Sequence, residues 1–199
     1  MTEGNLSPSA ERLLAVAMSL FAEKGYERTT VGEIQEAAGL TFGSGALYKH
    51  FASKEAVLAE GISRFVDHAR RERQLLGALE DMEIADALEV IARQAMFSFA
   101  RDRDALRIAW RDLEAFPALQ ESVRTERIRA TFDDLAAWLA DQAERGHVTT
   151  SDPHAAAAVA LSSLAFFQLL AFLLHDTPGG LSEDRFVEAW SELFAAALT

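Results

Sequence analysis

The sequence predicts an all-α protein, with a short N-terminal group of three helices followed by a longer helical part. Three observations support this fold class. Apolar residues recur at helical spacing along most of the chain, residues that cap helices stand at the ends of these segments, and no segment shows the alternation of a β-strand. Half of the 199 residues are apolar, which suffices for one or two domains with a substantial core.

The first helix is expected to begin after Ser7 and to end at Gly25. Ser7 is a suitable N-cap, and Pro8 fits the first helical position, where no backbone N–H is needed. The apolar residues of this segment form one stripe, which predicts a packing helix: Leu13, Leu14, Ala17, Leu20 and Phe21.

Two short helices are expected next, separated by a turn. Thr30 and Glu33 have the spacing of a capping box, and Gly39 supplies the left-handed residue that ends the helix they begin. A second helix is predicted from near Thr41, with Thr41 or Ser44 as its cap. This pair is too small to enclose a core of its own, which favours a helix-turn-helix that serves recognition.

The same stretch resembles the DNA-binding signature of the TetR (tetracycline repressor) family. The matching residues are Thr29, Thr30, Val31, Ile34, Ala38, Gly39, the run from Leu47 to Phe51, and Ser53, Lys54 and Glu55. Between Gly39 and Leu47 the family usually has five residues, whereas this chain has seven, residues 40–46, so the register of the recognition helix stays open. The resemblance implies a helix-turn-helix DNA-binding domain over residues 1–52 and a helical ligand-binding and dimerisation domain over residues 53–199.

Several side chains in this stretch are expected to contact DNA. Lys49 and Lys54 are candidates for phosphate contacts, and Thr30 lies at a helix start. Candidates for base contacts, or for contacts to either bases or phosphates, are Thr41, Phe42, Ser44, Tyr48 and His50. The expected partner is a double-stranded DNA operator with an inverted repeat, bound by a homodimer.

The charge of the chain opposes binding to DNA by bulk electrostatics. The net charge is −12 at a pI near 4.8, and residues 1–60 contain five Lys or Arg against eight Asp or Glu. Any DNA site must therefore be a local patch.

The alternative to a DNA-binding regulator is a helical dimeric interaction protein of the same fold that has lost DNA binding. A positive strip over Thr30, Lys49 and Lys54 favours the regulator, and a uniformly negative face favours the alternative.

The middle of the chain is expected to form four amphipathic helices. The first runs from Ser53 to around Gly77 and includes the charged run RRERQ, which is interpreted mainly as an exposed face. Segments 84–101 and 105–114 follow, the second with Leu106, Trp110 and Leu113 facing inward. The fourth helix begins at Pro117, keeps helical spacing through Ile128 and ends at Gly146.

Asp152 and Pro153 are the expected cap and first-turn residue of the next helix. Its residues 155–174 are apolar almost all round over the length of a membrane span. The flanks carry no Lys or Arg, and Ser162, Ser163 and Gln168 interrupt the segment, so no membrane span is predicted. A helix of this kind must be covered on every side. We therefore expect a homodimer through the last two long helices, the second of which carries a stripe of Phe186, Trp190, Leu193, Phe194 and Ala197. The polar N-terminus lacks a secretory signal, so a cytoplasmic protein is expected.

The sequence favours no enzyme. Glu144 and His147 have the spacing of a di-iron motif, but that site needs the motif twice, and Gly146 ends the helix inside this copy. The glycines around Ser44 lack the strand and the Gly-Lys-Ser/Thr of a phosphate loop. We therefore predict no catalytic residue, metal site or cofactor.

The resemblance also implies a pocket for a small, largely apolar effector that weakens DNA binding. Candidate apolar walls, chosen from the aromatic residues outside the DNA-binding domain, are Phe99, Trp110, Phe132 and Phe167. Gln168, an amide in an otherwise apolar helix, is the candidate for orienting the ligand. A hydrogen bond across the dimer interface is the alternative role for Gln168.

Overall fold

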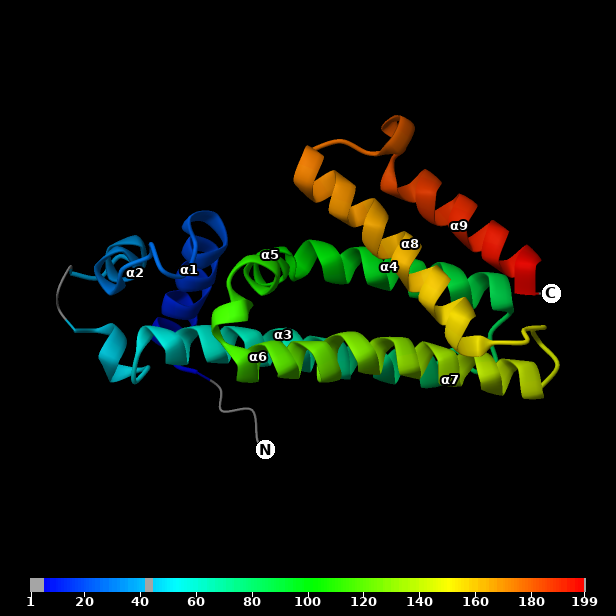
Figure 1. The fold of residues 1–199 in the computed structure, drawn as a ribbon, viewed down its shortest axis with the longest axis horizontal. Coiled ribbons are helices and arrows are strands. Elements are labelled where there is room, and N and C mark those ends of the chain that lie inside the picture. The colour runs from blue at the N-terminus through cyan, green and yellow to red at the C-terminus, as the bar shows by residue number, and fades with distance from the viewer. Residues whose placement is uncertain (1–5, 42–44, 199) are drawn as a thin grey trace. The chain divides into compact units, whose positions relative to one another are not determined.

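The computed structural model describes residues 6–41 and 45–198, and the regular structure of these residues is helical (Figure 1). The chain forms two compact units. Unit 1 comprises Met1–Asp67 and Asp102–Arg124, and unit 2 comprises His68–Arg101 and Thr125–Thr199. The chain therefore passes between the units three times, and neither unit is one continuous segment.

Unit 1 contains the N-terminal helices together with a segment from the middle of the chain. Its elements are α1 (Pro8–Lys24), α2 (Val31–Ala37), the 3-10 turn η1 (Leu47–Lys49), the first part of α3 (Lys54–Gly77), α5 (Arg103–Arg111), η2 (Leu113–Ala115) and α6 (Pro117–Ser122). The predicted cap at Ser7 is confirmed, and Ser53 at the start of α3 makes the same kind of bond. The Ser7 hydroxyl accepts from the Ala10 amide at 3.3 Å, and the Ser53 hydroxyl accepts from the Ala56 amide at 3.0 Å.

The core of unit 1 joins residues that are far apart in sequence. Leu13 and Phe21 of the predicted stripe are fully buried, as are Ile34 of α2 and Leu47 of η1. Ile108 of α5 is equally buried in this cluster. The N-terminal helices therefore complete their core with a helix that lies about half a chain later.

The expected recognition helix is shorter among the described residues than the sequence predicts. Only Leu47–Lys49 has helical geometry between Gly45 and Phe51, as a single 3-10 turn. Gly45 has φ +65°, in the left-handed region, so the chain cannot continue an α-helix through it. Phe42 and Ser44 lie outside the described residues.

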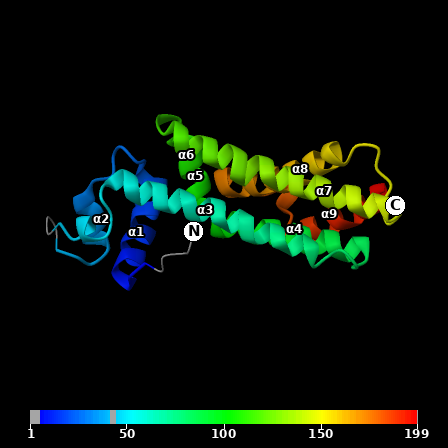
Figure 2. The same cartoon turned by 90° about the horizontal axis from the view of Figure 1, so that it is seen from below.

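Unit 2 is a group of helices around a second apolar core. It contains the second part of α3, α4 (Ile84–Arg101), most of the π-helix η3 (Val123–Arg129), α7 (Ala130–Glu144), α8 (Pro153–Leu174), η4 (Pro178–Gly180) and α9 (Glu183–Leu198). Helix α8 lies against α7 and α4, and α9 lies along α4 (Figures 1 and 2). The predicted cap of α8 is confirmed, because Asp152 accepts from the Ala155 amide at 3.0 Å.

The predicted helix from Pro117 is present and runs without a break to Glu144, but its middle is not α-helical. The segment forms α6, a π-helix over Val123–Arg129 and then α7. The i→i+5 hydrogen bonds of a π-helix widen the turn and rotate the side chains that follow. Ile128, which the helical spacing placed inward, is consequently half exposed, with 50% of its surface accessible.

The charged run after Ala69 is only partly an exposed face. Glu72 forms ion pairs with both Arg101 of α4 and Arg127 of the π-helix, and the accessible fractions of these three side chains are 19%, 29% and 14%. Arg73 pairs with Asp134 of α7. The run thus ties α3 to three other segments of unit 2.

The C-terminal helices leave a large apolar surface uncovered. The segment Pro153–Phe172 has the length and hydropathy of a membrane span, with a mean hydropathy of 2.0, and only 22% of it is buried. Val159, Phe166 and Leu174 of α8 and Leu193 of α9 are each about 60% exposed or more. The predicted apolar stripe of α9 is divided between core and surface, since Trp190 is buried and Leu193 is exposed.

Glu72→Ala should destabilise the protein by about 2 kcal/mol, less than the loss from a fully buried pair because these side chains keep some contact with water. The physical reason is that the substitution leaves Arg101 and Arg127 without their shared carboxylate. Urea unfolding at a fixed protein concentration measures the change.

Glu121→Ala is the matched control. It removes a carboxylate from the Arg124 ion pair, whose side chains are 51% and 56% exposed, so the loss should stay below about 0.5 kcal/mol. Equal losses in the two variants would show that the Glu72 network adds no more than a surface pair.

Candidate nucleic-acid interface

The capping box predicted at the start of α2 is present. Thr30 Oγ1 accepts from the Glu33 amide at 3.2 Å, and Glu33 Oε2 accepts from the Thr30 amide at 2.8 Å. Gly39, with φ +74°, follows the end of the helix as predicted. Both ends of α2 are therefore fixed by residues of the local sequence.

The Glu33 carboxylate is held in its charged form by several donors. The Thr30 backbone amide, the Lys24 ammonium at 2.9 Å and the Thr30 hydroxyl all stabilise it and lower the pKa of Glu33 to about 2. Lys24 belongs to α1, so this carboxylate also connects the end of α1 to the start of α2.

Gln35 connects α2 to η1, which stands where the recognition helix was expected and is called the recognition turn below. The sequence interpretation missed this role. Its side-chain Oε1 accepts from the Leu47 amide at 3.1 Å, and the residue is only 2% exposed. The available signal was its position beside Ile34, on the buried stripe of α2. A polar side chain on such a stripe requires a partner.

Lys54 binds within the protein instead of pointing freely to solvent. Its Nζ donates to the carbonyl oxygens of Tyr26 at 2.8 Å and Thr29 at 2.9 Å, and lies 4.1 Å from the centre of the Tyr26 ring. Two of its three N–H donors are thus used inside unit 1. Its predicted phosphate contact remains a prediction, whereas its hold on the turn between α1 and α2 is a feature of the structure.

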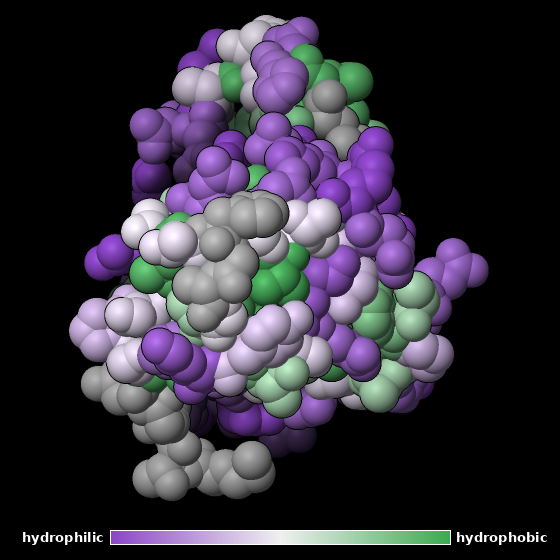
Figure 3. Space-filling model, turned by 90° about the vertical axis from the view of Figure 1, so that its left-hand side faces the viewer, coloured by the Kyte–Doolittle hydropathy of each residue, from purple (hydrophilic) through white to green (hydrophobic). Residues whose placement is uncertain are grey.

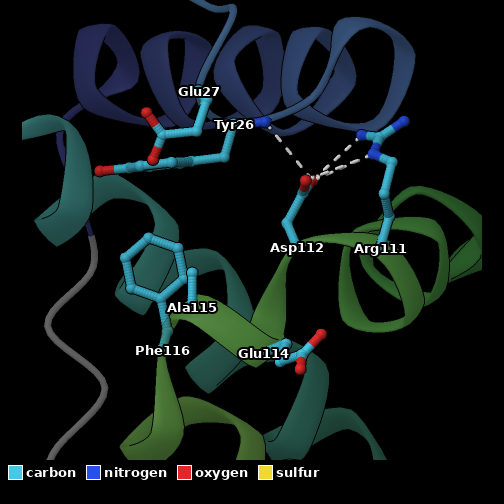
Figure 4. A pocket seen from close by; sticks show the side chains of 7 residues that line it. All are labelled: Tyr26, Glu27, Arg111, Asp112, Glu114, Ala115 and Phe116. Carbon is cyan, nitrogen blue, oxygen red and sulfur yellow. Dashed lines mark hydrogen bonds and ion pairs between the residues drawn. The ribbon is translucent and has the colours of Figure 1, made fainter.

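Tyr26 is the centre of that turn. Its ring packs 5.2 Å from the Phe21 ring and meets Phe116 edge to face at 4.8 Å. Burial, followed by the charges of Glu55 and Glu27, raises the pKa of the Tyr26 phenol. A cleft of about 380 Å³ opens beside it (Figure 4), and its lining residues are Tyr26, Glu27, Arg111, Asp112, Glu114, Ala115 and Phe116.

The residues that the helix-turn-helix presents to solvent lie on and beside η1. Tyr48 is 60% exposed, and Thr41, Lys49 and His50 are also exposed. His50 Nδ1 lies 3.5 Å from the Ser7 hydroxyl. The end of unit 1 that faces the viewer in Figure 3 carries hydrophilic side chains with small hydrophobic areas between them.

The positive strip expected over Thr30, Lys49 and Lys54 is much reduced. Lys54 is directed to backbone carbonyls, and Lys24 is paired with Glu33. Within residues 6–41 and 45–198, Lys49 has no acidic side chain at ion-pair distance. Of the three lysines Lys24, Lys49 and Lys54, Lys49 is therefore the best placed to meet a phosphate.

The predicted effector residues do not all belong to one unit. Trp110 is in unit 1 and is 65% exposed, so the prediction that it faces inward was wrong. Helix α5 ends one residue later, at Arg111, and buries Ala105 and Ile108 on its other side. Phe99, Phe132 and Phe167 are in unit 2, where Phe99 and Phe132 are half-buried.

Phe167 and Gln168 make contacts that link α8 to α9. The Phe167 ring stacks on Phe186 at 3.9 Å, and Gln168 Nε2 donates to Glu183 Oε2 at 3.0 Å. Gln168 Nε2 also lies 2.8 Å from the sulfur of Met96. The amide thus has partners within its own subunit.

The indole nitrogen Nε1 of Trp138, in α7, is a buried polar atom of unit 2. The residue is 5% exposed, and its Nε1 has no hydrogen-bond partner among the described residues. A buried N–H without an acceptor costs about 1–3 kcal/mol. This indole N–H is therefore a buried donor without an acceptor among the described residues of unit 2.

Comparison with known proteins gives matches in both parts of the chain. Residues 13–60 match the family "Bacterial regulatory proteins, tetR family", and residues 86–197 match "AefR-like transcriptional repressor, C-terminal domain". The second match alone covers more than half of the chain.

Individual relatives are similar over different lengths. The chain is 42% identical over 64 residues to the HTH-type transcriptional repressor KstR2 of Mycobacterium tuberculosis, which is 32% of this chain and 31% of that repressor. This alignment therefore spans less than a third of KstR2. The chain is 30% identical over 152 residues to the HTH-type transcriptional repressor AcnR of Corynebacterium efficiens, covering 73% of this chain and 71% of AcnR.

A solved structure extends the similarity to nearly the whole chain. The transcriptional regulator PfmR of Thermus thermophilus superposes with a TM-score of 0.72 at 25% identity, covering 93% of this chain and 97% of PfmR. The two-part helical architecture is thus shared with a solved regulator.

The capping box generates a prediction about pH. Because the pKa of Glu33 is lower in the folded protein than its ordinary value of 4.5, the unfolded chain binds the extra proton. The contribution of Glu33 to stability should be complete above pH 4.5 and should decrease as the pH falls toward 2. Glu33→Gln, which keeps an acceptor but not the charge, should lack this dependence. Denaturant unfolding of the two proteins across this window measures the difference, and parallel pH curves would contradict the assignment.

Proposed function

Since the chain belongs to the TetR family of bacterial regulatory proteins, we propose that it is a dimeric repressor released from its operator by a small apolar effector. Members of this family are DNA-binding transcriptional regulators and not enzymes. The observation that carries the DNA-binding part of the proposal is the braced helix-turn-helix. Gln35 fixes η1 to α2, and this places Tyr48, Lys49 and His50 in solvent on one short turn.

Binding to the operator uses two copies of this turn. Lys49 contacts phosphate, and Tyr48 and His50 are its exposed neighbours in the sequence. Thr30 and Thr41, which are also exposed, are further candidates for contacts to DNA. Phe42 and Ser44 remain candidates for base contacts from the sequence alone. In a symmetric dimer the half-sites of an inverted repeat lie about one helical turn apart, roughly 34–36 Å, or a multiple of it.

The dimer interface is proposed on α8 and α9. Val159 and Phe166 are separated by two turns of α8 and are 62% and 59% exposed, while Leu193 of α9 is 71% exposed. Exposed apolar side chains of this size on neighbouring helices favour burial against a partner. A second copy of the chain has the same apolar face, and the two faces can cover each other in a symmetric homodimer. The exposed apolar surface of α8 therefore does not require a membrane.

An effector site is proposed in unit 2. The unpaired indole N–H of Trp138 supports a ligand that carries a hydrogen-bond acceptor, and Phe99, Phe132 and Phe167 supply aromatic surface in the same unit. Gln168 stays a candidate for orienting the ligand, by exchanging its bond to Glu183. The protein acts in the cytoplasm. There the effector opposes DNA binding, because the effector and the operator select different conformations of the protein.

The second candidate function is a dimeric interaction protein of the same fold without DNA binding. The net charge of −12 and the internal use of Lys54 favour it. Binding of the purified protein to an inverted repeat in the DNA flanking its gene separates the two. Binding at a defined repeat supports the repressor, and no binding at moderate salt supports the interaction protein.

Lys49→Ala should weaken binding to operator and to random DNA alike, and should reduce the salt slope of the binding constant by about one. The reason is that a phosphate contact releases a counterion whatever the base sequence. Fluorescence anisotropy at several salt concentrations measures both quantities. Arg185→Ala, an exposed cation of α9 in unit 2, is the charge-matched control and should leave the slope unchanged. An unchanged slope for Lys49→Ala would remove this residue from the interface.

Leu193→Glu should convert the dimer to monomers, because it places a carboxylate on the proposed interface where burial of a charge is costly. Sedimentation velocity measures the assembly state. Phe97→Glu is the control, since Phe97 of α4 is also exposed, at 59%, but lies outside the proposed face. A dimer that survives Leu193→Glu and dissociates with Phe97→Glu would place the interface elsewhere.

A further inference from the structure

The turn between α1 and α2 receives a pair of neighbouring charged residues from the end of α5. Figure 4 shows Arg111 and Asp112 close to Tyr26 of this turn, and the pair is bonded to the Tyr26 amide and the Ala22 carbonyl. All the residues concerned lie in unit 1. Neither residue has a role in the DNA contacts proposed above.

Arg111 binds two carbonyls in the last turn of α1, and that of Phe21 also accepts from the Gly25 amide at 2.9 Å. The last turn of a helix leaves carbonyl groups without intrahelical donors. Arg111 Nη1 donates to the Ala22 carbonyl at 3.1 Å, and Nη2 donates to the Phe21 carbonyl. A cation at this position is also favoured by the negative end of the helix dipole.

The neighbouring carbonyls of α1 are satisfied from within the turn. The Thr29 hydroxyl donates to the Gly25 carbonyl at 2.9 Å, and Arg28 Nε donates to the Lys24 carbonyl at 2.6 Å. Thr29 is fully buried. Arg111 therefore supplies the two hydrogen bonds at this helix end that come from a distant part of the chain.

Asp112 holds both its neighbour and the turn. Its Oδ2 accepts from Arg111 Nη2 at 3.0 Å and from the Tyr26 amide at 3.4 Å. The Asp112 side chain is only 15% exposed, whereas that of Arg111 is 37% exposed, so the carboxylate is the more shielded of the two from water. The carboxylate thus orients the Arg111 guanidinium and reaches the backbone of the turn.

The Tyr26 backbone is held from both sides. Asp112 accepts from its N–H, and Lys54 of α3 donates to its carbonyl oxygen at 2.8 Å. Four residues further along the chain is Thr30, the N-cap that starts α2. The position of Tyr26 therefore sets where α2 begins, and Gln35 carries that position on to the recognition turn through its bond to Leu47.

We propose that Arg111 and Asp112 are a positioning pair for operator binding, which holds the α1–α2 turn in the conformation that places the recognition turn for DNA. This inference rests on the proposed DNA-binding function. When the pair is broken, only part of the population has the competent turn, and the apparent affinity falls by the competent fraction. The contacts in the bound state stay the same, so the number of phosphate contacts is unchanged.

The test compares Arg111→Ala and Asp112→Ala with the parent. The probes are a duplex carrying the inverted repeat that the parent binds and a scrambled duplex of the same length. Each variant should bind the repeat about tenfold more weakly, which corresponds to losing one or two charge-assisted hydrogen bonds. Binding to the scrambled duplex should change less than about twofold, and the salt slope for the repeat should not change, unlike that of a phosphate-contact variant.

Amide hydrogen exchange on the free protein provides the second measurement. Exchange at the Tyr26 amide and in the first turn of α2 should be faster in both variants, while the amides of unit 2 stay as in the parent. Asp112→Asn keeps an acceptor for the Tyr26 amide and should restore part of the protection if the alanine variant folds poorly. Glu114→Gln changes a carboxylate in the same cleft that is outside the pair, and should behave as the parent.

The outcomes separate the two levels of the proposal. A parent that binds no duplex contradicts the proposed function, and the exchange data then decide the positioning role alone. If the parent binds the repeat and the variants bind it equally well, the positioning role is overturned. An equal loss on both duplexes with faster exchange throughout the chain overturns it as well, since it indicates general destabilisation. A salt slope lowered by about one would instead make Arg111 a direct phosphate contact.

Discussion

The bond between the Lys54 ammonium and the Tyr26 carbonyl is the interaction on which the helix-turn-helix depends. Of residues 25–30, Tyr26 alone belongs to the buried apolar cluster, so hydrogen bonds to the turn add to the packing of α2 in fixing its direction. Lys54 provides them from α3, with its charge also resting on the Tyr26 ring. A lysine that the sequence assigns to DNA thus serves first as a structural cation, because carbonyl oxygens of the turn stand where its side chain reaches.

This use of cations explains how an acidic protein can carry a DNA-binding fold. Lys24 is paired with Glu33, and Arg64 is bound by Glu11 and Glu60, so much of the positive charge in unit 1 supports packing. The charge left for DNA is small and local, and short-range contacts must then contribute more than long-range attraction. Such a surface favours selectivity over general affinity for nucleic acid, because random duplexes gain little from it.

The sequence predicted what is decided locally. The caps at Ser7, Thr30 and Asp152 each depend on a side chain and an amide three residues away, and all three are present. The class of fold and the two-part architecture followed from the apolar spacing and the family resemblance. Features that depend on distant partners were missed. The roles of Gln35 and Asp112 require Leu47 and Tyr26, which no periodicity identifies. Ile128 was placed inward because helical spacing was extended across a π-helix, where the phase changes. Trp110 was placed on the wrong side of α5, which buries Ala105 and Ile108 instead.

The discontinuous make-up of unit 1 has a consequence for how the protein is made. Its buried cluster contains Ile108, Leu113 and Val123 together with Leu13 and Phe21, so the N-terminal helices leave the ribosome long before their core can close. During that interval the apolar faces of α1 and α3 have no permanent cover and are open to chaperones and to misassociation. An early-emerging helix-turn-helix is therefore kept incomplete until α5 arrives. A chain that ends before α5 lacks part of the buried cluster on which its helix-turn-helix packs.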